Sequence, residues 1–459
     1  MKFELMLTAI IFILLFLKIG NNRINTGNVL NLINILLIIN LLAGFFGNAE
    51  GRLFGNMFMT NELLVLEKNL LNLGTFIISL QAYTWLKSHK HAIEFYILLL
   101  STLMGMFFMI SSQNILMFYL GLELSTIPLA ALVNFDLEKR RSSEAAIKYI
   151  VSSAFSSGLL LLGISFLYGT TGSLNFTEIS AQLQQTPLQI FAFILLIAGF
   201  GFKISAVPFH LWTADVYEGS PVAVTSYLSV VSKGAILFVF VSALYSVFAS
   251  FQLLWSQMLT ILIIITLIIG NLFAIRQNNI KRFLAFSSIA QVGFILVGML
   301  GNSTEGNASV IYFILIYVFS NLGAFGVISV VSSATGKENI IDYKGFYKTN
   351  PLLAWALTIC LFSLAGIPPT AGFFGKFFLI MAGAAEGNYI LITTAALNMI
   401  VSLYYYLKIV KAMFMDVNDN PIESLQTDIY PKVALAICIA GVVITGFVGG
   451  CYDYIHSLL

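Results

Sequence analysis

The segment from Gly199 to Lys233 combines chemical groups that an apolar helix ordinarily lacks. It carries the amines of Lys203 and Lys233 and the imidazole of His210. Pro208 lies among them and removes a backbone hydrogen-bond donor. Ionisable groups beside a helix break are typical of transporter sites at the membrane midplane. We therefore expect this segment to form half of an ion path.

The composition places this segment in a membrane. The chain has 459 residues, of which 59% are hydrophobic and only 10% charged, and its mean hydropathy is +0.92. A soluble protein of this length would need far more polar surface. The net charge of +2 gives no reason to expect nucleic acid as a partner. The three cysteines have no C-x-x-C spacing, so neither a zinc site nor an iron–sulfur site is expected.

Apolar stretches of helix length predict an all-α polytopic membrane protein with about fourteen transmembrane helices. The stretches fall at 5–19, 28–47, 70–86, 93–111, 114–134, 142–168, 187–215, 219–248, 253–275, 281–301, 307–334, 351–385, 388–415 and 430–450. The seventh and twelfth would run ~43 and ~52 Å as straight helices, against a ~30 Å hydrocarbon core. Each contains proline, Pro208 in the seventh and Pro368-Pro369 in the twelfth. Both are therefore predicted to be broken helices.

An internal repeat indicates how these helices are organised. FKISAVP at 202–208 aligns with FSLAGIP at 362–368, and residues 155–172 align with residues 319–336. The offset spans five helices, and an odd number of crossings inverts the second copy in the membrane. We therefore expect an N-terminal three-helix segment at 1–92, a first five-helix repeat at 93–250, a second, inverted five-helix repeat at 251–415, and a C-terminal loop and helix at 416–459.

The basic residues predict the orientation of the chain. Most lysines and arginines lie in loops after odd-numbered helices, whereas the opposite side holds only Lys2, Arg52 and Lys68. By the positive-inside rule the odd-numbered loops face the cytoplasm. Both termini are therefore expected on the outer side.

Buried ionisable side chains are the candidates for a proton path. Glu123, on the fifth helix, is the only acid far from both ends of a predicted span. Four lysines lie within predicted spans: Lys148, Lys203, Lys233 and Lys376. Four uncompensated lysines would cost on the order of 10–14 kcal/mol. Because one carboxylate cannot neutralise four amines, some of the amines should be neutral or exchange protons readily. Such an array is typical of a proton relay.

Several of these residues also allow a simpler interpretation. Lys148 could extend to the membrane interface, and Glu123 could form a purely structural ion pair with one lysine. His210 could relay protons between the buried amines and the cytoplasm, or it could be a hydrogen-bonded histidine at a helix break. Asp215 and Glu218 lie in an acidic cytoplasmic loop, where they could collect protons or be solvated turn residues.

The positions of the lysines relative to the prolines suggest a division of roles. Lys203 precedes Pro208 by five residues, whereas Lys376 follows Pro368 by eight, in repeats of opposite orientation. We expect Lys203 to serve the cytoplasmic half of the path and Lys376 the outward half. Glu123 and Lys203 are expected to form a switchable pair that gates proton passage.

Six stretches of the sequence together resemble a known family. They are GLELSTIPLAAL, EAAIKYIVSSAFSSGLLLLGISFLYGTTGS, GFKISAVPFHLWTADVYEGSP, RFLAFSSIAQVGFIL, LAGIPPTAGFFGKF and NMIVSLYYYLKIVKAMF. The chain resembles the antiporter-like membrane subunits of the proton-pumping NADH:quinone oxidoreductase, respiratory complex I, and among these the subunit N family. The resemblance covers nearly the whole chain and is strongest from about residue 90 to 415.

The resemblance implies a role for each candidate residue. The family's glutamate on the fifth helix and its lysine on the sixth fall on Glu123 and Lys148. Its charged residues on the broken seventh, the eighth and the broken twelfth helices fall on Lys203, Lys233 and Lys376. These residues would form a relay in a translocase subunit of the membrane arm, driven by quinone reduction elsewhere in the complex.

The resemblance also implies partners and a location. NADH, FMN, iron–sulfur clusters and quinone would be bound by other subunits, so this chain would carry neither a cofactor nor a metal. Its partners would be other membrane-arm subunits, including neighbouring antiporter-like subunits, and the lipid of a bacterial inner membrane. The alternatives are a subunit of a multisubunit Na⁺/H⁺ antiporter or of a membrane-bound hydrogenase, or a stand-alone solute or lipid carrier.

Overall fold

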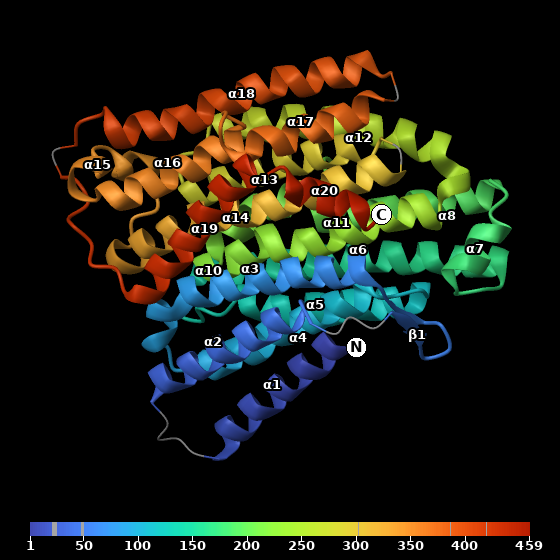
Figure 1. Cartoon of the computed structure of the whole chain (residues 1–459), viewed down its shortest axis with the longest axis horizontal. Coiled ribbons are helices and arrows are strands. Elements are labelled where there is room, and N and C mark those ends of the chain that lie inside the picture. The colour runs from blue at the N-terminus through green and yellow to red at the C-terminus, as the bar shows by residue number, and fades with distance from the viewer. Residues whose placement is uncertain (21–24, 47–49, 302, 386, 419) are drawn as a thin grey trace.

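The chain folds into a bundle of long helices with one small hairpin (Figure 1). The computed structural model describes residues 1–20, 25–46, 50–301, 303–385, 387–418 and 420–459. The helices of the first half are α1 (Lys2–Gly20), α2 (Thr26–Ala43), α3 (Glu62–Lys87), α4 (Ala92–Ile110), α5 (Ile115–Val133), α6 (Arg140–Thr171), α7 (Phe176–Gln182), α8 (Pro187–Ile204), α9 (Leu211–Gly219), α10 (Val222–Tyr227) and α11 (Lys233–Ser246). The π-helical segment Leu228–Ser232 joins α10 to α11, and strand β1 (Gly51–Leu53) pairs antiparallel with β2 (Phe58–Thr60).

The second half repeats the pattern of long apolar helices. Its helices are α12 (Gln252–Ile275), α13 (Ile280–Gly298), α14 (Ser303–Thr335), α15 (Phe346–Thr349), α16 (Pro351–Ala365), α17 (Ala371–Ala384), α18 (Tyr389–Phe414), α19 (Ile429–Phe447) and α20 (Gly450–Ser457). Short 3₁₀ turns lie at Ala249–Phe251 and Ile340–Tyr343.

All fourteen predicted spans are present. In the described part of the chain, 13 spans are long and apolar enough to cross a membrane, and α16 and α17 together account for the remaining crossing. The chain is therefore an integral, multi-pass membrane protein. One predicted boundary is wrong: the third span begins at Glu62 rather than near residue 70, so Lys68 lies inside α3 and not in an outward loop.

Both predicted helix breaks are present and share one backbone geometry. α8 stops before α9, and α16 stops before α17. The C-cap residues, Ser205 (φ 65°) and Gly366 (φ 86°), are both left-handed. In each case the following amide, from Ala206 or Ile367, bonds the carbonyl five residues back and closes the last turn. The remaining terminal carbonyls of α8 and α16 are left for side chains to satisfy.

The starts of α5 and α13 match in the same way. Asn114 caps the first helix and Asn279 caps the second, each through its side-chain oxygen. Each capping residue also forms an isolated antiparallel bridge, with Asn175 and Asn339 respectively. These paired features agree with the predicted inverted repeats.

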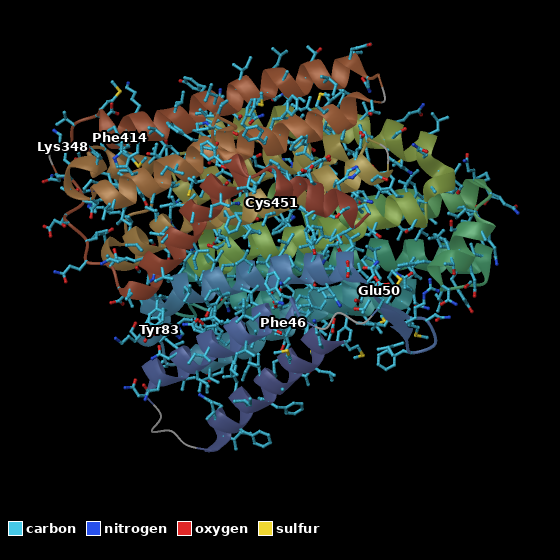
Figure 2. All side chains as sticks on the ribbon, in the orientation of Figure 1. Phe46, Glu50, Tyr83, Lys348, Phe414 and Cys451 are labelled. Carbon is cyan, nitrogen blue, oxygen red and sulfur yellow. The ribbon has the colours of Figure 1, made fainter. Side chains whose placement is uncertain are left out.

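The most enclosed spans lie at the centre of the bundle. They are α3, the α10–α11 span, α13 and α14. In Figure 1, α1 and α18 run along opposite edges, while β1 and α7 lie at one end and α15 at the other. Many exposed large apolar side chains lie on the outer helices, and Phe46, labelled in Figure 2, is exposed just after the end of α2. The polar groups described below therefore lie inside an apolar shell.

Gly366→Ala tests the backbone geometry of the second break. A Cβ at this position would lie 3.1 Å from Lys376 Cδ, on a backbone with φ of 86°. Because L-residues are strained in that conformation, the substitution should destabilise the chain by about 1–3 kcal/mol. Thermal unfolding of the detergent-solubilised complex would measure this. Gly158→Ala, in open space on α6, is the matched control. An equal change in both variants would contradict this account of the break.

Candidate functional site

Lys203 lies in the last turn of α8, immediately before the first break. Its side chain is 9% exposed, and Nζ donates hydrogen bonds to Ser153 Oγ at 2.7 Å and Thr126 Oγ1 at 3.1 Å. Both acceptors are neutral hydroxyls, one on α6 and one on α5. The C-terminal end of a helix also carries partial negative charge, which favours a cation there. The break therefore creates a place where an amine can be held without a carboxylate.

Glu123 lies on α5, about one turn from the residue that binds Lys203. It is half-buried, and its Oε1 is buried without a hydrogen-bond partner among the described residues. No ion pair joins Glu123 to Lys203 in this part of the chain, because the amine is turned to Thr126 and Ser153. A switchable Glu123–Lys203 pair therefore stays a prediction.

Lys233 opens α11 directly after the π-helical segment. It is buried, and Nζ donates to Ser288 Oγ on α13 at 2.8 Å. The ammonium also lies 5.4 Å from the centre of the Tyr217 ring. Short π-helical segments widen a helix locally and are frequent at functional sites. The irregular segment sets the position at which the amine enters the core.

Lys376 lies on α17 and is 0% exposed. Its Nζ reaches back across the second break and donates to the carbonyls of Leu364 at 2.8 Å and Ala365 at 3.3 Å. These are terminal carbonyls of α16, which have no partner within their own helix. The amine also lies 4.5 Å from the centre of the Phe294 ring. The second break therefore provides the acceptors that the lysine needs.

Neutral groups on α13 link the surroundings of Lys233 to those of the third lysine. Ser288, which accepts from Lys233, follows Ser287, whose hydroxyl is hydrogen-bonded to Tyr406. Gln291 Nε2 donates to the Tyr406 hydroxyl at 3.1 Å and to the Leu364 carbonyl at 2.9 Å. That carbonyl is the one that also binds the amine on α17. A polar line therefore crosses the core along α13.

A second polar contact joins the π-helical segment to α14. Asn321 Nδ2 donates to Ser229 Oγ at 2.8 Å, and the Tyr317 hydroxyl lies 3.2 Å from the same oxygen. These neutral residues were not predicted from the sequence. The one available signal was the recurrence of serine, asparagine, glutamine and tyrosine in the most enclosed spans, where apolar side chains are the rule.

Lys148 lies apart from the buried amines, and the expectation of burial is wrong. The side chain is 42% exposed and forms ion pairs with Asp215 at 2.7 Å and Glu144 at 2.8 Å. Arg282 of α13 binds Asp215 Oδ1 at 2.5 Å and Glu218 Oε2 at 3.0 Å. Long side chains near a helix end can reach the interface in this way. The simpler interpretation of Lys148 is the one that the structure supports.

The same ion pairs decide how Asp215 can act. Burial raises the pKa of this carboxyl, but hydrogen bonds from Lys148 and Arg282 outweigh burial, so its pKa lies below the usual value. A carboxylate held ionised by two cations is a poor proton collector at neutral pH. Asp215 and Glu218 instead tie α9 to α6 and α13.

His210 precedes α9 and is buried. Its Nδ1 has no hydrogen-bond partner among the described residues. The alternative of a fully hydrogen-bonded histidine therefore does not describe this nitrogen. A relay role for His210 stays a prediction.

A buried charge cluster in the N-terminal segment was missed. Lys68 Nζ donates to Glu4 Oε1 and to Ser111 Oγ, both at 2.5 Å, and Glu67 is also buried. The sequence had suggested that Glu123 is the only acid deep inside a span. In the structure, Glu4 and Glu67 are both more buried than Glu123. Both N-terminal acids lie within two turns of a helix start, where apolar periodicity gives no warning of burial.

Comparison with known proteins decides the family. The transmembrane family model of the NADH:quinone oxidoreductases and Mrp antiporters matches residues 112–402. NADH-quinone oxidoreductase subunit N of Phocaeicola vulgatus is 47% identical over 462 residues, covering 100% of this chain and 98% of that protein. The subunit N of Azobacteroides pseudotrichonymphae is 48% identical over 413 residues, covering 89% and 86%. This chain belongs to the subunit N family of NADH-quinone oxidoreductases. It is thus a membrane subunit of an enzyme complex.

Solved structures place the subunit N family within a wider fold. A chain of respiratory complex I from Thermus thermophilus with bound aureothin superimposes with a TM-score of 0.83 at 26% identity, covering 98% of this chain and 97% of that one. A chain of the Mrp complex from Dietzia sp. gives a TM-score of 0.86 at 18% identity, covering 99% and 95%. The second likeness shows a shared fold and nothing further.

In this member of the subunit N family, the predicted site residues divide into two groups. The first group contains three buried amines, those of Lys203, Lys233 and Lys376. It also contains the buried His210 and the half-buried Glu123. Lys148 belongs to the exposed charge cluster instead.

Lys68→Met tests the buried N-terminal cluster. Removing the amine leaves the buried Glu4 carboxylate with only the N-terminal ammonium, 3.9 Å away, so stability should fall by about 3 kcal/mol. The double variant Lys68→Met/Glu4→Gln removes both charges and should be less destabilised than the single variant. Thermal unfolding in detergent measures both, with the exposed Lys348→Met as a control. A double variant less stable than the single one would refute the pairing.

Proposed function

We propose that this chain is a proton-translocating subunit in the membrane arm of NADH-quinone oxidoreductase. One observation carries the proposal: three lysines are buried in the core, and their amines bond only neutral oxygen atoms among the described residues. An ammonium group inside a membrane is costly without a partner charge. Three buried amines without partner charges would lower the stability of the fold, so a role in moving protons explains their presence better than a structural role.

The hydrogen-bond acceptors suggest different roles in proton transfer for the three buried amines. A hydroxyl both donates and accepts hydrogen bonds, so Ser153 can satisfy an amine with or without its extra proton. Thr126 and Ser288 can do the same only by turning away from the carbonyls of Leu122 and Ala285, to which they donate. Lys203 and Lys233 are held by such hydroxyls. A carbonyl only accepts, so the site on α16 offers no donor to the lone pair of a neutral amine and favours the ammonium form. We infer that the first two amines exchange protons readily and that Lys376 holds a proton for release on the outward side.

Redox chemistry would take place elsewhere in the complex. NADH, FMN, the iron–sulfur clusters and quinone would be bound by other subunits, and their reaction would drive this chain through neighbouring membrane-arm subunits. The distribution of basic residues supports an orientation with both termini on the periplasmic side of a bacterial inner membrane. A subunit of a Na⁺/H⁺ antiporter or of a membrane-bound hydrogenase is less favoured, because the near relatives are of subunit N.

Removing either member of the Glu123–Lys203 pair tests the proposal. Glu123→Gln and Lys203→Ala should leave the complex assembled but reduce both NADH-driven proton uptake and coupled quinone reduction. The double variant should be little worse than either single variant, because both residues act on one step. Proton uptake by inverted membrane vesicles, measured beside assembly of the complex, provides the test. Normal pumping by an assembled Glu123→Gln complex would end the proposal.

Tyr406→Phe tests the polar line between Lys233 and Lys376. The substitution removes the hydroxyl that joins Ser287 to Gln291 and keeps the ring. Loss of one link in a proton path should slow uptake by about tenfold or more. Tyr404→Phe is the matched control, because Tyr404 lies on the same helix and is 62% exposed. Equal uptake rates in the two variants would show that protons do not pass this hydroxyl.

A further inference from the structure

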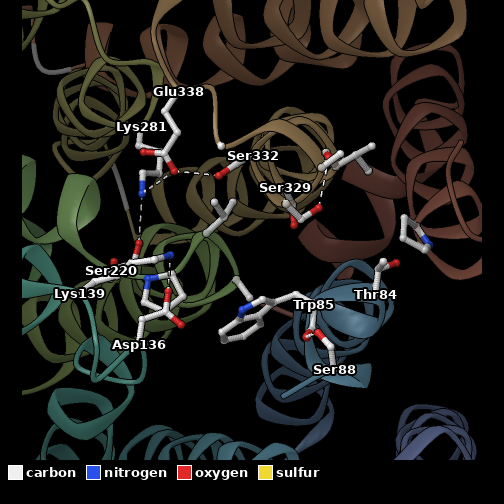
Figure 3. Close-up of a pocket in the computed structure, with 18 of the residues that line it drawn as sticks. Thr84, Trp85, Ser88, Asp136, Lys139, Ser220, Lys281, Ser329, Ser332 and Glu338 are labelled. Carbon is white, nitrogen blue, oxygen red and sulfur yellow. Dashed lines mark hydrogen bonds and ion pairs between the residues drawn. The ribbon is translucent and has the colours of Figure 1, made fainter. Parts of the chain in front are cut away.

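A cavity of about 670 Å³ opens at the end of the bundle where α3 and α14 finish and α10 and α13 begin. Its walls combine apolar and polar side chains, and the polar ones include Asp136, Lys139, Lys281, Ser332 and Glu338 (Figure 3). The loops at this end of the bundle carry most of the basic residues, so by the positive-inside rule this end faces the cytoplasm. The cavity is roomy enough for many waters.

A nearly buried ion pair forms one wall of this cavity. The Lys281 side chain is buried, and Nζ lies 3.0 Å from Glu338 Oε1 and 3.2 Å from the Ser220 carbonyl (Figure 3). Ser332 Oγ donates to the same carboxylate oxygen at 2.8 Å. Both side chains line the cavity, and Glu338 is 23% exposed whereas Lys281 is 6% exposed. The pair therefore has one side in water and one side in the core.

Three spans that line the cavity lead to the surroundings of Lys233. On α13, Lys281 and Ser288 are seven residues apart, or about 10 Å along the helix, and Ser288 binds the amine of Lys233. The span that starts beside Ser220 passes through the π-helical segment to Lys233 itself. On α14, Asn321 binds the Ser229 hydroxyl of that segment.

A second, smaller cavity of about 210 Å³ is the competing entrance. It is lined by Lys148, Asp215, Glu218 and Arg282, of which the sequence suggested the first three as relay members or proton collectors. Glu218 also lines the larger cavity. The charges of these four residues are paired with one another. None of the four makes a hydrogen bond to Lys203 among the described residues. The larger cavity therefore offers the better connected route.

We propose that the 670 Å³ cavity is the proton-uptake vestibule and that the Lys281–Glu338 pair is its first exchange site, delivering protons to Lys233 rather than to Lys203. This proposal rests on the proposed proton-translocating function. A proton from cavity water binds the Glu338 carboxylate and breaks the ion pair. The Lys281 ammonium then gives its proton inward, through water, to the Lys233 amine. Neutral Lys281 takes the proton from Glu338, and the pair forms again.

The test uses the assembled complex in inverted vesicles, whose cytoplasmic face is outward. Glu338→Gln removes the first proton acceptor, so NADH-driven proton uptake should fall about tenfold or more. Glu338→Asp keeps a carboxylate and should recover most of the rate. NADH oxidation by an acceptor that bypasses the membrane arm should stay normal in both variants, which shows that the redox part of the complex is intact, and recovery in Glu338→Asp separates loss of the carboxylate from a folding defect.

Thiol labelling distinguishes the two entrances even if Glu338→Gln fails to assemble. Ser329→Cys places a thiol on the wall of the larger cavity, and Glu144→Cys places one at the smaller cavity. A membrane-impermeant, cationic methanethiosulfonate reagent added outside the vesicles should block uptake through the first variant by about tenfold. The Glu144→Cys variant and the wild-type complex should be unaffected.

The outcomes separate this proposal from the proposed function. If the reagent blocks Glu144→Cys and spares Ser329→Cys, or if Glu338→Gln pumps normally, the vestibule is wrong. If the vestibule proposal fails but Glu123→Gln still abolishes proton uptake, the proposed function stands without the vestibule. If an assembled Glu123→Gln complex also pumps normally, the proposed function itself falls.

Discussion

A positive charge in the hydrocarbon core needs hydrogen-bond acceptors, and a regular helix has none to spare. Each of the three buried lysines without a carboxylate partner among the described residues lies beside an interruption of regular helix. Lys203 precedes the α8–α9 break, Lys233 follows the π-helical segment, and Lys376 reaches across the α16–α17 break. The interruption frees carbonyls or changes the spacing of neighbouring helices so that hydroxyls can approach. The irregular backbone and the charges therefore depend on one another.

Helix α13 connects these three places because it lies at the centre of the bundle and carries polar groups on more than one face. Ser288 binds Lys233, while Gln291 contacts the carbonyl that holds the third lysine. At its start, Arg282 binds Asp215 and so fixes α9, the far half of the first broken helix. One enclosed helix of the second repeat thus organises the broken helices of both repeats. A shift of α13 would alter all of these contacts together.

The sequence was sufficient for the fourteen spans, both breaks and the burial of Lys203, Lys233 and Lys376, because hydropathy, proline and charge are local signals. It was not sufficient for the exposure of Lys148, since apolar periodicity does not say which face of α6 meets the bundle. Lys68 was misplaced because Glu67, Lys68 and Asn69 interrupt the apolar stretch of α3, which made the span seem to begin only after them. The hydroxyl and carbonyl partners depend on helices distant in sequence. Tyr406 and Ser287 meet only once the bundle has packed.

Ordered water in the native assembly is the most direct test of the central claim, that the three lysines form one proton-conducting line. A density map of the intact complex, at a resolution that shows individual waters, should reveal water joining Lys203 to Lys233. It should also show water along the polar line of α13 as far as Lys376. Tightly packed apolar side chains without water between Lys233 and Lys376 would contradict the account.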